Sequence, residues 1–152
     1  MRVFITGASS GIGTALARAY AARGATLALV ARREAELKAL AASLPVTCFV
    51  YALDVADAGA LQAAAADFIA NAGLPDIVIA NAGVSAGTLT EEREDIAAFA
   101  RIFAVNVTGT VSTFAPFAKA MRERGSGRLV GIASVAGVRG SPGAGAYSAK
   151  EG

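Results

Sequence analysis

Proton transfer is the chemistry that the side chains near the end of this chain suggest first. The 152 residues include no histidine, so the commonest general acid–base group is missing. Tyr147 is followed three residues later by Lys150. A free phenol has a pKa of about 10, and a neighbouring ammonium group favours the phenolate. We therefore predict that Tyr147, with Lys150 beside it, exchanges a proton with a carbonyl or alcohol oxygen; the alternative is a tyrosine that only caps a core.

A glycine-rich turn is the second feature with chemical meaning. It lies between the apolar segment 3–5 and a segment with helical spacing. Glycines there let the backbone approach a pyrophosphate, and the free N–H groups of a helix start bind its charge. The residues predicted to bind the phosphates are Gly7, Ser9, Ser10, Gly11, Ile12 and Gly13. A turn that merely joins a strand to a helix is the competing interpretation.

Two arginines bear on which dinucleotide such a turn would hold. Arg32 and Arg33 follow the apolar segment 26–30, where an NAD-binding chain places an acidic residue on the ribose 2′-hydroxyl. A guanidinium binds a 2′-phosphate through paired hydrogen bonds, whereas a carboxylate repels it. We predict NADP(H) as the preferred cofactor, with NAD(H) as the alternative. Arginines that only begin a solvated helix would explain the same residues, although such cations oppose the helix dipole.

Alternating strands and helices have to position these groups. Five apolar runs are continuous, as strands buried on both faces are, and they lie at 3–5, 26–30, 46–51, 77–80 and 129–133. Helical spacing fills the gaps, with two helical segments, 91–104 and 107–124, before the last run. The predicted core positions in these helices include Ile12, Leu37, Leu61, Phe103, Val111, Phe114, Ala118 and Met121. The order predicts an α/β fold, a doubly wound parallel sheet with helices on both faces, in a single domain over residues 1–152.

Composition narrows the classes of protein. Hydrophobic residues make up 55% of the chain and charged residues 17%, which favours a globular protein over a disordered one. Gly, Arg, Asp or Asn interrupts every apolar run, so none approaches the ~20 residues of a membrane span, and we predict a cytoplasmic protein. A formal net charge of +2 without a basic cluster disfavours nucleic acid as a partner. With no histidine and one cysteine, Cys48, we predict no metal site.

The glycine turn and five later features resemble the short-chain dehydrogenase/reductase family. The turn reads Thr-Gly-Ala-Ser-Ser-Gly-Ile-Gly, and matches follow in the family's order at Asp54-Val55, Asn81-Ala82-Gly83-Val84, Asn106, Ser134 and Tyr147. The resemblance implies a Rossmann fold and hydride transfer between a nicotinamide and a small-molecule carbonyl or alcohol. It also implies further cofactor contacts, with the adenine near Asp54 and Val55 and the adenosine ribose near Asn81, Ala82 and Gly83. Taken singly, these are ordinary loop residues.

The same resemblance implies a catalytic set and an assembly. Ser134 would hydrogen-bond the substrate oxygen, Tyr147 would donate or accept the proton, Lys150 would also hold the nicotinamide ribose, and Asn106 would support a water relay. Singly, Ser134 is also compatible with a plain turn and Asn106 with a kink between two helical segments. The segment 107–124 is similar to a helix through which family members form homodimers and homotetramers.

Two features depart from the family pattern. The family has Tyr-x-x-x-Lys, whereas this chain has Tyr-x-x-Lys, and positions i+3 and i+4 of a helix lie about 100° apart around its axis. The sequence also stops at Gly152, where family members continue for roughly another third of their length; a frameshift or a truncation would each produce both features. These two departures motivate an alternative function, namely an NADP(H)-binding module without catalysis or an inactive truncated form. An extended-type epimerase or dehydratase on the same fold is a third.

Overall fold

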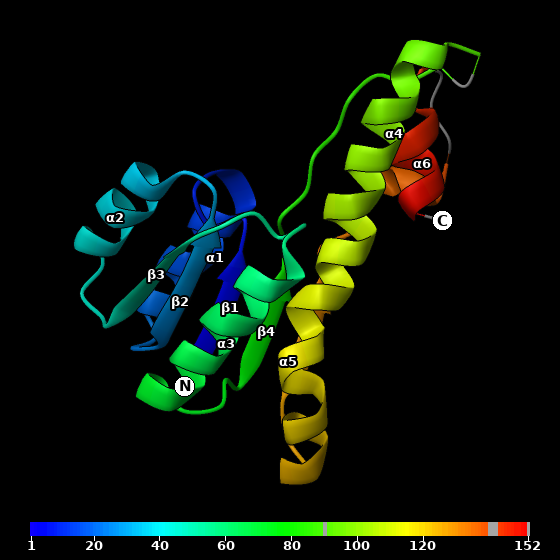
Figure 1. Cartoon of the computed structure of the whole chain (residues 1–152). Coiled ribbons are helices and arrows are strands. Elements are labelled where there is room, and N and C mark those ends of the chain that lie inside the picture. The colour runs from blue at the N-terminus through cyan, green and yellow to red at the C-terminus, as the bar shows by residue number, and fades with distance from the viewer. Residues whose placement is uncertain (90, 140–142, 152) are drawn as a thin grey trace.

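Five parallel strands form one sheet in the order β3-β2-β1-β4-β5 (Figure 1). The computed structural model describes residues 1–89, 91–139 and 143–151. The strands are β1 (Arg2–Thr6), β2 (Thr26–Ala31), β3 (Cys48–Ala52), β4 (Ile77–Ala80) and β5 (Arg128–Gly131). From β1 the chain builds outward to β2 and β3, then returns to the other side of β1 for β4 and β5. This reversal confirms the predicted doubly wound sheet.

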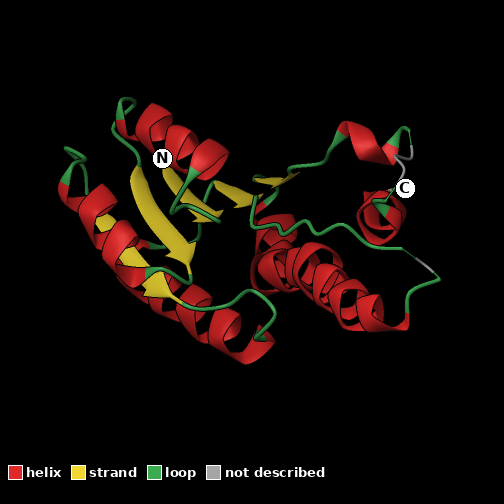
Figure 2. Cartoon of the chain, turned by 90° about the horizontal axis from the view of Figure 1, so that it is seen from above, coloured by secondary structure: helices red, strands yellow, loops and turns green. Residues whose placement is uncertain are grey.

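Helices cover both faces of the sheet, as predicted (Figure 2). The helices are α1 (Gly11–Ala21), α2 (Glu34–Ala42), α3 (Ala58–Ala72), α4 (Ile96–Phe103), α5 (Gly109–Arg124) and α6 (Gly145–Glu151). Short helical turns are η1 (Arg93–Asp95), the π-turn η2 (Ala104–Thr108) and η3 (Val135–Gly137). α1 and α2 pack on one face, and α3 and α5 on the other. At the far end of the long helical run, α4 lies beside α6 (Figure 1).

The two faces of β1 show why its apolar run is continuous. Val3 and Ile5 are fully buried against the α1–α2 layer, while Phe4 between them points to the α3–α5 layer. The Phe4 ring lies 5.9 Å from that of Phe68 in α3 and 5.0 Å from that of Phe117 in α5, measured between centroids. A strand with helices on both sides has no solvent face, so alternation with polar residues is lost.

The predicted core positions were right for α2 and α3 and partly wrong elsewhere. Leu37 and Leu61 are buried, but Ile12, in the first turn of α1, is 58% exposed. In α5 the buried face includes Thr113, which apolar spacing did not predict. Val111, a predicted core position, is 62% exposed. Thr113 tolerates burial because its hydroxyl donates to the Gly109 carbonyl at 2.7 Å.

The two predicted helical segments 91–104 and 107–124 join without a break. The run Arg93–Arg124 is long and apolar enough to cross a membrane by length and composition, and 22% of its most apolar window is buried. Phe117 and Met121 of this run pack into the core beneath the sheet. Core helices of soluble proteins meet the same criterion, so this single run is weak grounds for a membrane span.

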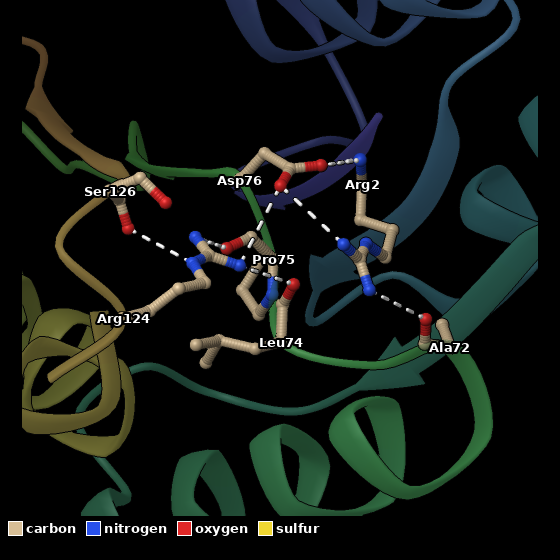
Figure 3. A network of polar contacts seen from close by, with 7 residues as sticks. All are labelled: Arg2, Ala72, Leu74, Pro75, Asp76, Arg124 and Ser126. Atoms are coloured by element: carbon tan, nitrogen blue, oxygen red, sulfur yellow. Dashed lines mark hydrogen bonds and ion pairs between the residues drawn. The ribbon is translucent and has the colours of Figure 1, made fainter.

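A charged network closes the amino-terminal edge of the sheet (Figure 3). Asp76 precedes β4, and its carboxylate accepts a 2.7 Å hydrogen bond from the backbone N–H of Arg2. The guanidinium groups of Arg2 and Arg124 each lie 3.6 Å from the same carboxylate. Arg124 also donates to the carbonyls of Leu74 and Pro75, at 3.2 and 2.8 Å. One carboxylate thus links the start of β1, the start of β4 and the end of α5.

Ionisation of Asp76 is coupled to folding. Burial alone would raise its pKa, but the Arg2 N–H and the two guanidinium groups outweigh that effect and lower the pKa. An unfolded aspartate titrates near pH ~4. A carboxyl group with a depressed folded-state pKa contributes stability above that pH, and the contribution is lost as the pH falls through the folded-state pKa.

We predict that Asp76→Asn lowers the free energy of unfolding by about 1 kcal/mol at pH 7, a modest value because the network is partly exposed. The deficit should shrink as the pH is lowered below about 4, and urea unfolding curves measure it. Glu123→Gln is the matched control, because Glu123 faces Lys119 at 3.9 Å in an exposed pair. A variant as stable as wild type at pH 7 would contradict the prediction.

Candidate functional site

The glycine turn brings backbone against backbone at the carboxyl edge of the sheet. Gly7 has a φ of +67°, and a Cβ there would lie 2.8 Å from the Cα of Ala82. A Cβ on Gly13 would overlap the carbonyl oxygen of Gly7. Both positions therefore require glycine, one for its conformation and both for the space. The turn is as tight as the sequence predicted.

Side-chain hydrogen bonds fasten the turn to the end of β4. The Thr6 hydroxyl oxygen accepts from the backbone N–H groups of Asn81 and Ala82, each at 3.1 Å. The Asn81 amide donates to the carbonyls of Thr6 and Gly7, at 3.1 and 3.2 Å. β1 and β4 are the neighbours at which the sheet reverses its direction of growth, so this bond set holds the turn at the topological switch point.

A cavity of about 560 Å³ opens at this place, a size typical of ligand sites. All the predicted cofactor residues except Gly13, which is buried behind Gly7, line it. They are Gly7, Ser9, Ser10, Gly11, Ile12, Arg32, Arg33, Asp54, Val55, Asn81, Ala82 and Gly83. Sequence reasoning missed Ala31, Leu53, Val84, Arg101 and Val105, which line it too.

The start of α1 faces this cavity, and no nearby acidic residue of the helix neutralises the partial positive charge of its first turn. Ser10 is the N-cap, and among the described residues no side chain caps the helix and no acidic residue stands in its first turn. The first N–H groups of a helix have no intrahelical partner and carry a partial positive charge. Together with the glycine turn they form a place suited to an anionic group.

The two arginines after β2 differ in their contacts. Arg33 donates to the backbone oxygen and the hydroxyl of Ser9, at 3.1 and 3.3 Å, and pairs with Glu36 at 3.3 Å. Arg33 therefore braces the glycine turn as well as lining the cavity. Arg32 lines the cavity near Asp54, whose charge it influences.

A second cavity of about 360 Å³ adjoins the first and gathers the predicted catalytic groups. Asn106, Ser134 and Tyr147 line it, although they come from η2, the loop after β5 and α6. The two cavities share Ile12 and the residues 81–84. Lys150 lies on α6 one turn after Tyr147, and its side chain is outside the described residues. Gly152 is outside them as well.

Asn106 is fixed by a reciprocal pair of hydrogen bonds. Its amide oxygen accepts from the Val84 N–H and its amide nitrogen donates to the Val84 carbonyl, both at 2.8 Å. The residue lies in the π-turn between α4 and α5, a local widening of the helix that is frequent at functional sites. This wider turn ties the helical run to the segment that follows β4.

Ser134 and α6 are held by further contacts near the second cavity. The Ser134 hydroxyl oxygen accepts from the Ala136 N–H at 3.3 Å and caps η3, so it both lines the cavity and ends the loop. Thr88, which sequence reasoning missed, is buried and accepts from the Ala146 N–H at 3.0 Å. Thr88 also forms a β-bridge with Ala144. No local pattern around Thr88 signals a partner 58 residues away.

Comparison with known proteins decides the family. A family model described as short chain dehydrogenase matches residues 1–151. This chain belongs to the short-chain dehydrogenases. Family members carry oxidoreductase names and bind nicotinamide cofactors.

Individual proteins are similar to this chain in sequence and in fold. The chain is 37% identical over 147 residues to a protein of Sphingomonas sp. (strain SKA58) named 2-dehydro-3-deoxy-L-rhamnonate dehydrogenase (NAD(+)), covering 97% of this chain and 59% of that protein. An alcohol dehydrogenase of Thermococcus sibiricus, solved with 5-hydroxy-NADP, superposes with a TM-score of 0.86 at 31% identity over 99% of this chain and 65% of its own. L-Sorbose reductase of Gluconobacter frateurii, solved with NADPH and L-sorbose, gives a TM-score of 0.89 at 28% identity over 99% and 58%. The chain thus spans less than two thirds of these short-chain dehydrogenases.

Proposed function

We propose that this chain forms the cofactor-binding and proton-transferring part of an NADP(H)-dependent oxidoreductase that acts on a small carbonyl or alcohol. The observation that carries the proposal is the junction of the two cavities along Ile12 and residues 81–84. The first cavity has the glycine turn in its lining, and the adjoining second cavity has Ser134 and Tyr147. A dinucleotide needs such an elongated site, with an anion-binding turn at its middle and a proton donor at one end.

The residues at the turn fit a pyrophosphate on structural grounds. Side chains at Gly7 and Gly13 would collide with the residues after β4 and with the turn itself, so the glycines keep the turn tight. The uncapped start of α1 then offers its N–H groups to the phosphate oxygens. Asp54 also lines the first cavity, and its carboxylate suits the amino group of an adenine.

Residues around the second cavity would carry the chemistry. NADPH, when bound, would supply the hydride that the carbonyl carbon accepts. Tyr147 gives its phenolic proton to the carbonyl oxygen, which leaves an alcohol, and takes a proton back in the reverse direction. Ser134 holds the substrate oxygen by a hydrogen bond, and Asn106 fixes the wall of the cavity through Val84. Lys150, which follows Tyr147 on the same helix, is the remaining member of the proposed catalytic set.

A nucleotide-binding module without turnover is the second candidate. The observation in its favour is the Tyr-x-x-Lys spacing, which places Lys150 three rather than four residues after Tyr147 on α6. Binding of NADPH without reduction of any compound in a carbonyl panel would select this candidate.

The location in the cell and the oligomeric state stay predictions. A cytoplasmic location rests on the sequence. Assembly as a homodimer or homotetramer is supported by apolar side chains exposed along the α4–α5 run, where Ile96 is 64% and Val111 62% exposed.

We predict that Tyr147→Phe in the full-length protein lowers kcat by about 100-fold or more, the size of a general-acid contribution. The affinity for NADPH should change less than threefold, because the variant keeps the ring and removes only the hydroxyl. Steady-state kinetics and fluorescence titration measure the two effects. Tyr51→Phe is the control: the Tyr51 hydroxyl bonds Asp67 at 2.7 Å, away from both cavities. Retained turnover in Tyr147→Phe would remove Tyr147 from the mechanism.

We predict that Arg32→Ala weakens NADPH binding by about 10- to 100-fold and NADH binding by less than threefold, because only the former carries a 2′-phosphate for the guanidinium. Arg33→Ala should weaken both, since Arg33 also braces Ser9. Arg23→Ala, at an exposed position after α1, is the control for loss of one positive charge. Equal losses for both cofactors in Arg32→Ala would contradict the NADP(H) preference.

A further inference from the structure

An ion pair in the wall of the first cavity joins two elements that are far apart in the sequence. Nη2 of Arg101, in α4, lies 2.5 Å from Oδ2 of Asp54, in the loop after β3. Both residues line the cavity, and their side chains are 41% and 32% exposed. A partly exposed pair of this kind contributes little to overall stability. Its effect is therefore local to the cavity wall.

The pair fixes the orientation of the Asp54 carboxylate. While Oδ2 is held by Arg101, Oδ1 accepts a 3.0 Å hydrogen bond from the Ala56 N–H. A carboxylate has about four acceptor sites, so these two bonds fix the plane of the group and leave acceptor sites for a donor in the cavity. Burial opposes the charge, but the Ala56 N–H and the nearby guanidinium groups outweigh it and lower the pKa of Asp54.

The ionised carboxylate can only accept hydrogen bonds. A purine with an exocyclic amino group offers it a donor, whereas hypoxanthine presents a carbonyl oxygen at the same position and is repelled. Loss of Arg101 would free the carboxylate to rotate and to protonate more easily, and a protonated carboxyl can donate as well as accept. The discrimination between the two bases therefore depends on the arginine.

The helix that carries Arg101 is fastened on both sides of the cavity. Five residues further along the same helical run, Asn106 bonds the backbone of Val84 beyond β4. Arg101 bonds Asp54 beyond β3. Because Asn106 holds the run independently, removing the Arg101 contact leaves one anchor in place and affects the Asp54 side of the cavity.

We propose that Arg101 is a positioning residue that holds the Asp54 carboxylate as the acceptor for the amino group of the cofactor's adenine, and so sets the preference of the site for adenine over hypoxanthine. This inference rests on the proposed function. The inference adds the role of Arg101, which orients the carboxylate that recognises the base.

The test compares NADPH with its hypoxanthine analogue, deamino-NADPH, by fluorescence titration of the full-length protein. Wild type should prefer NADPH by about 10-fold or more, as expected for a hydrogen bond to a charged group. Arg101→Ala should reduce the preference to less than threefold, and Arg101→Lys should restore part of it. Arg122→Ala removes the same charge from an exposed position on α5 and should keep the wild-type preference. Asp54→Asn should lose the preference, with no further loss in the double variant with Arg101→Ala.

Two outcomes would overturn the inference. If Arg101→Ala weakens both dinucleotides equally, the arginine only braces the wall; if the preference is unchanged in both Arg101 variants, it has no role in base recognition. Wild-type protein that binds neither dinucleotide would instead overturn the proposed function, and this inference with it.

Discussion

The close approach between the glycine turn and the end of β4 is the constraint on which the site depends. Gly7 and Gly13 leave no room for a β-carbon, and the Thr6 hydroxyl and Asn81 amide close the remaining gap with hydrogen bonds. Bulkier residues here would push α1 away from the carboxyl edge of the sheet. The start of α1 would then no longer face the cavity, and the two cavities would lose their shared wall.

The other elements of the site are arranged around this contact. The sheet reverses between β1 and β4, so the loops after these strands diverge and leave a space above their ends. The helical run from α4 to α5 lines that space and is fixed by Asn106 at Val84 and by Arg101 at Asp54. α6, which carries Tyr147, packs against α4, and the N–H of Ala146 in α6 donates a hydrogen bond to the Thr88 hydroxyl. Distant parts of the chain thereby meet around two adjoining cavities.

Much of this arrangement was predictable because it is encoded locally. Continuous apolar runs predicted the strands, since burial on both faces removes alternation, and the glycine spacing predicted the tight turn. The exact core face of α5 was not predictable from apolar spacing, because Thr113 is buried with its hydroxyl bonded inside its own helix. Arg101 and Asp54 are 47 residues apart in the sequence, and Thr88 and Ala146 are 58 residues apart. No local sequence pattern predicts either contact. Tertiary partners of this kind appear only once the elements are placed.

The central claim, that this turn holds the phosphates of a dinucleotide, is tested most directly by NADPH titration of the full-length protein and its Gly13→Ala variant. The account predicts that wild type binds NADPH and that Gly13→Ala, shown by circular dichroism to be folded, loses at least about 10-fold in affinity, because the added Cβ forces the Gly7 carbonyl and the turn apart. Gly59→Ala, at the open start of α3, should bind as wild type does. A folded Gly13→Ala protein with wild-type affinity, or a wild-type protein with none, would contradict it.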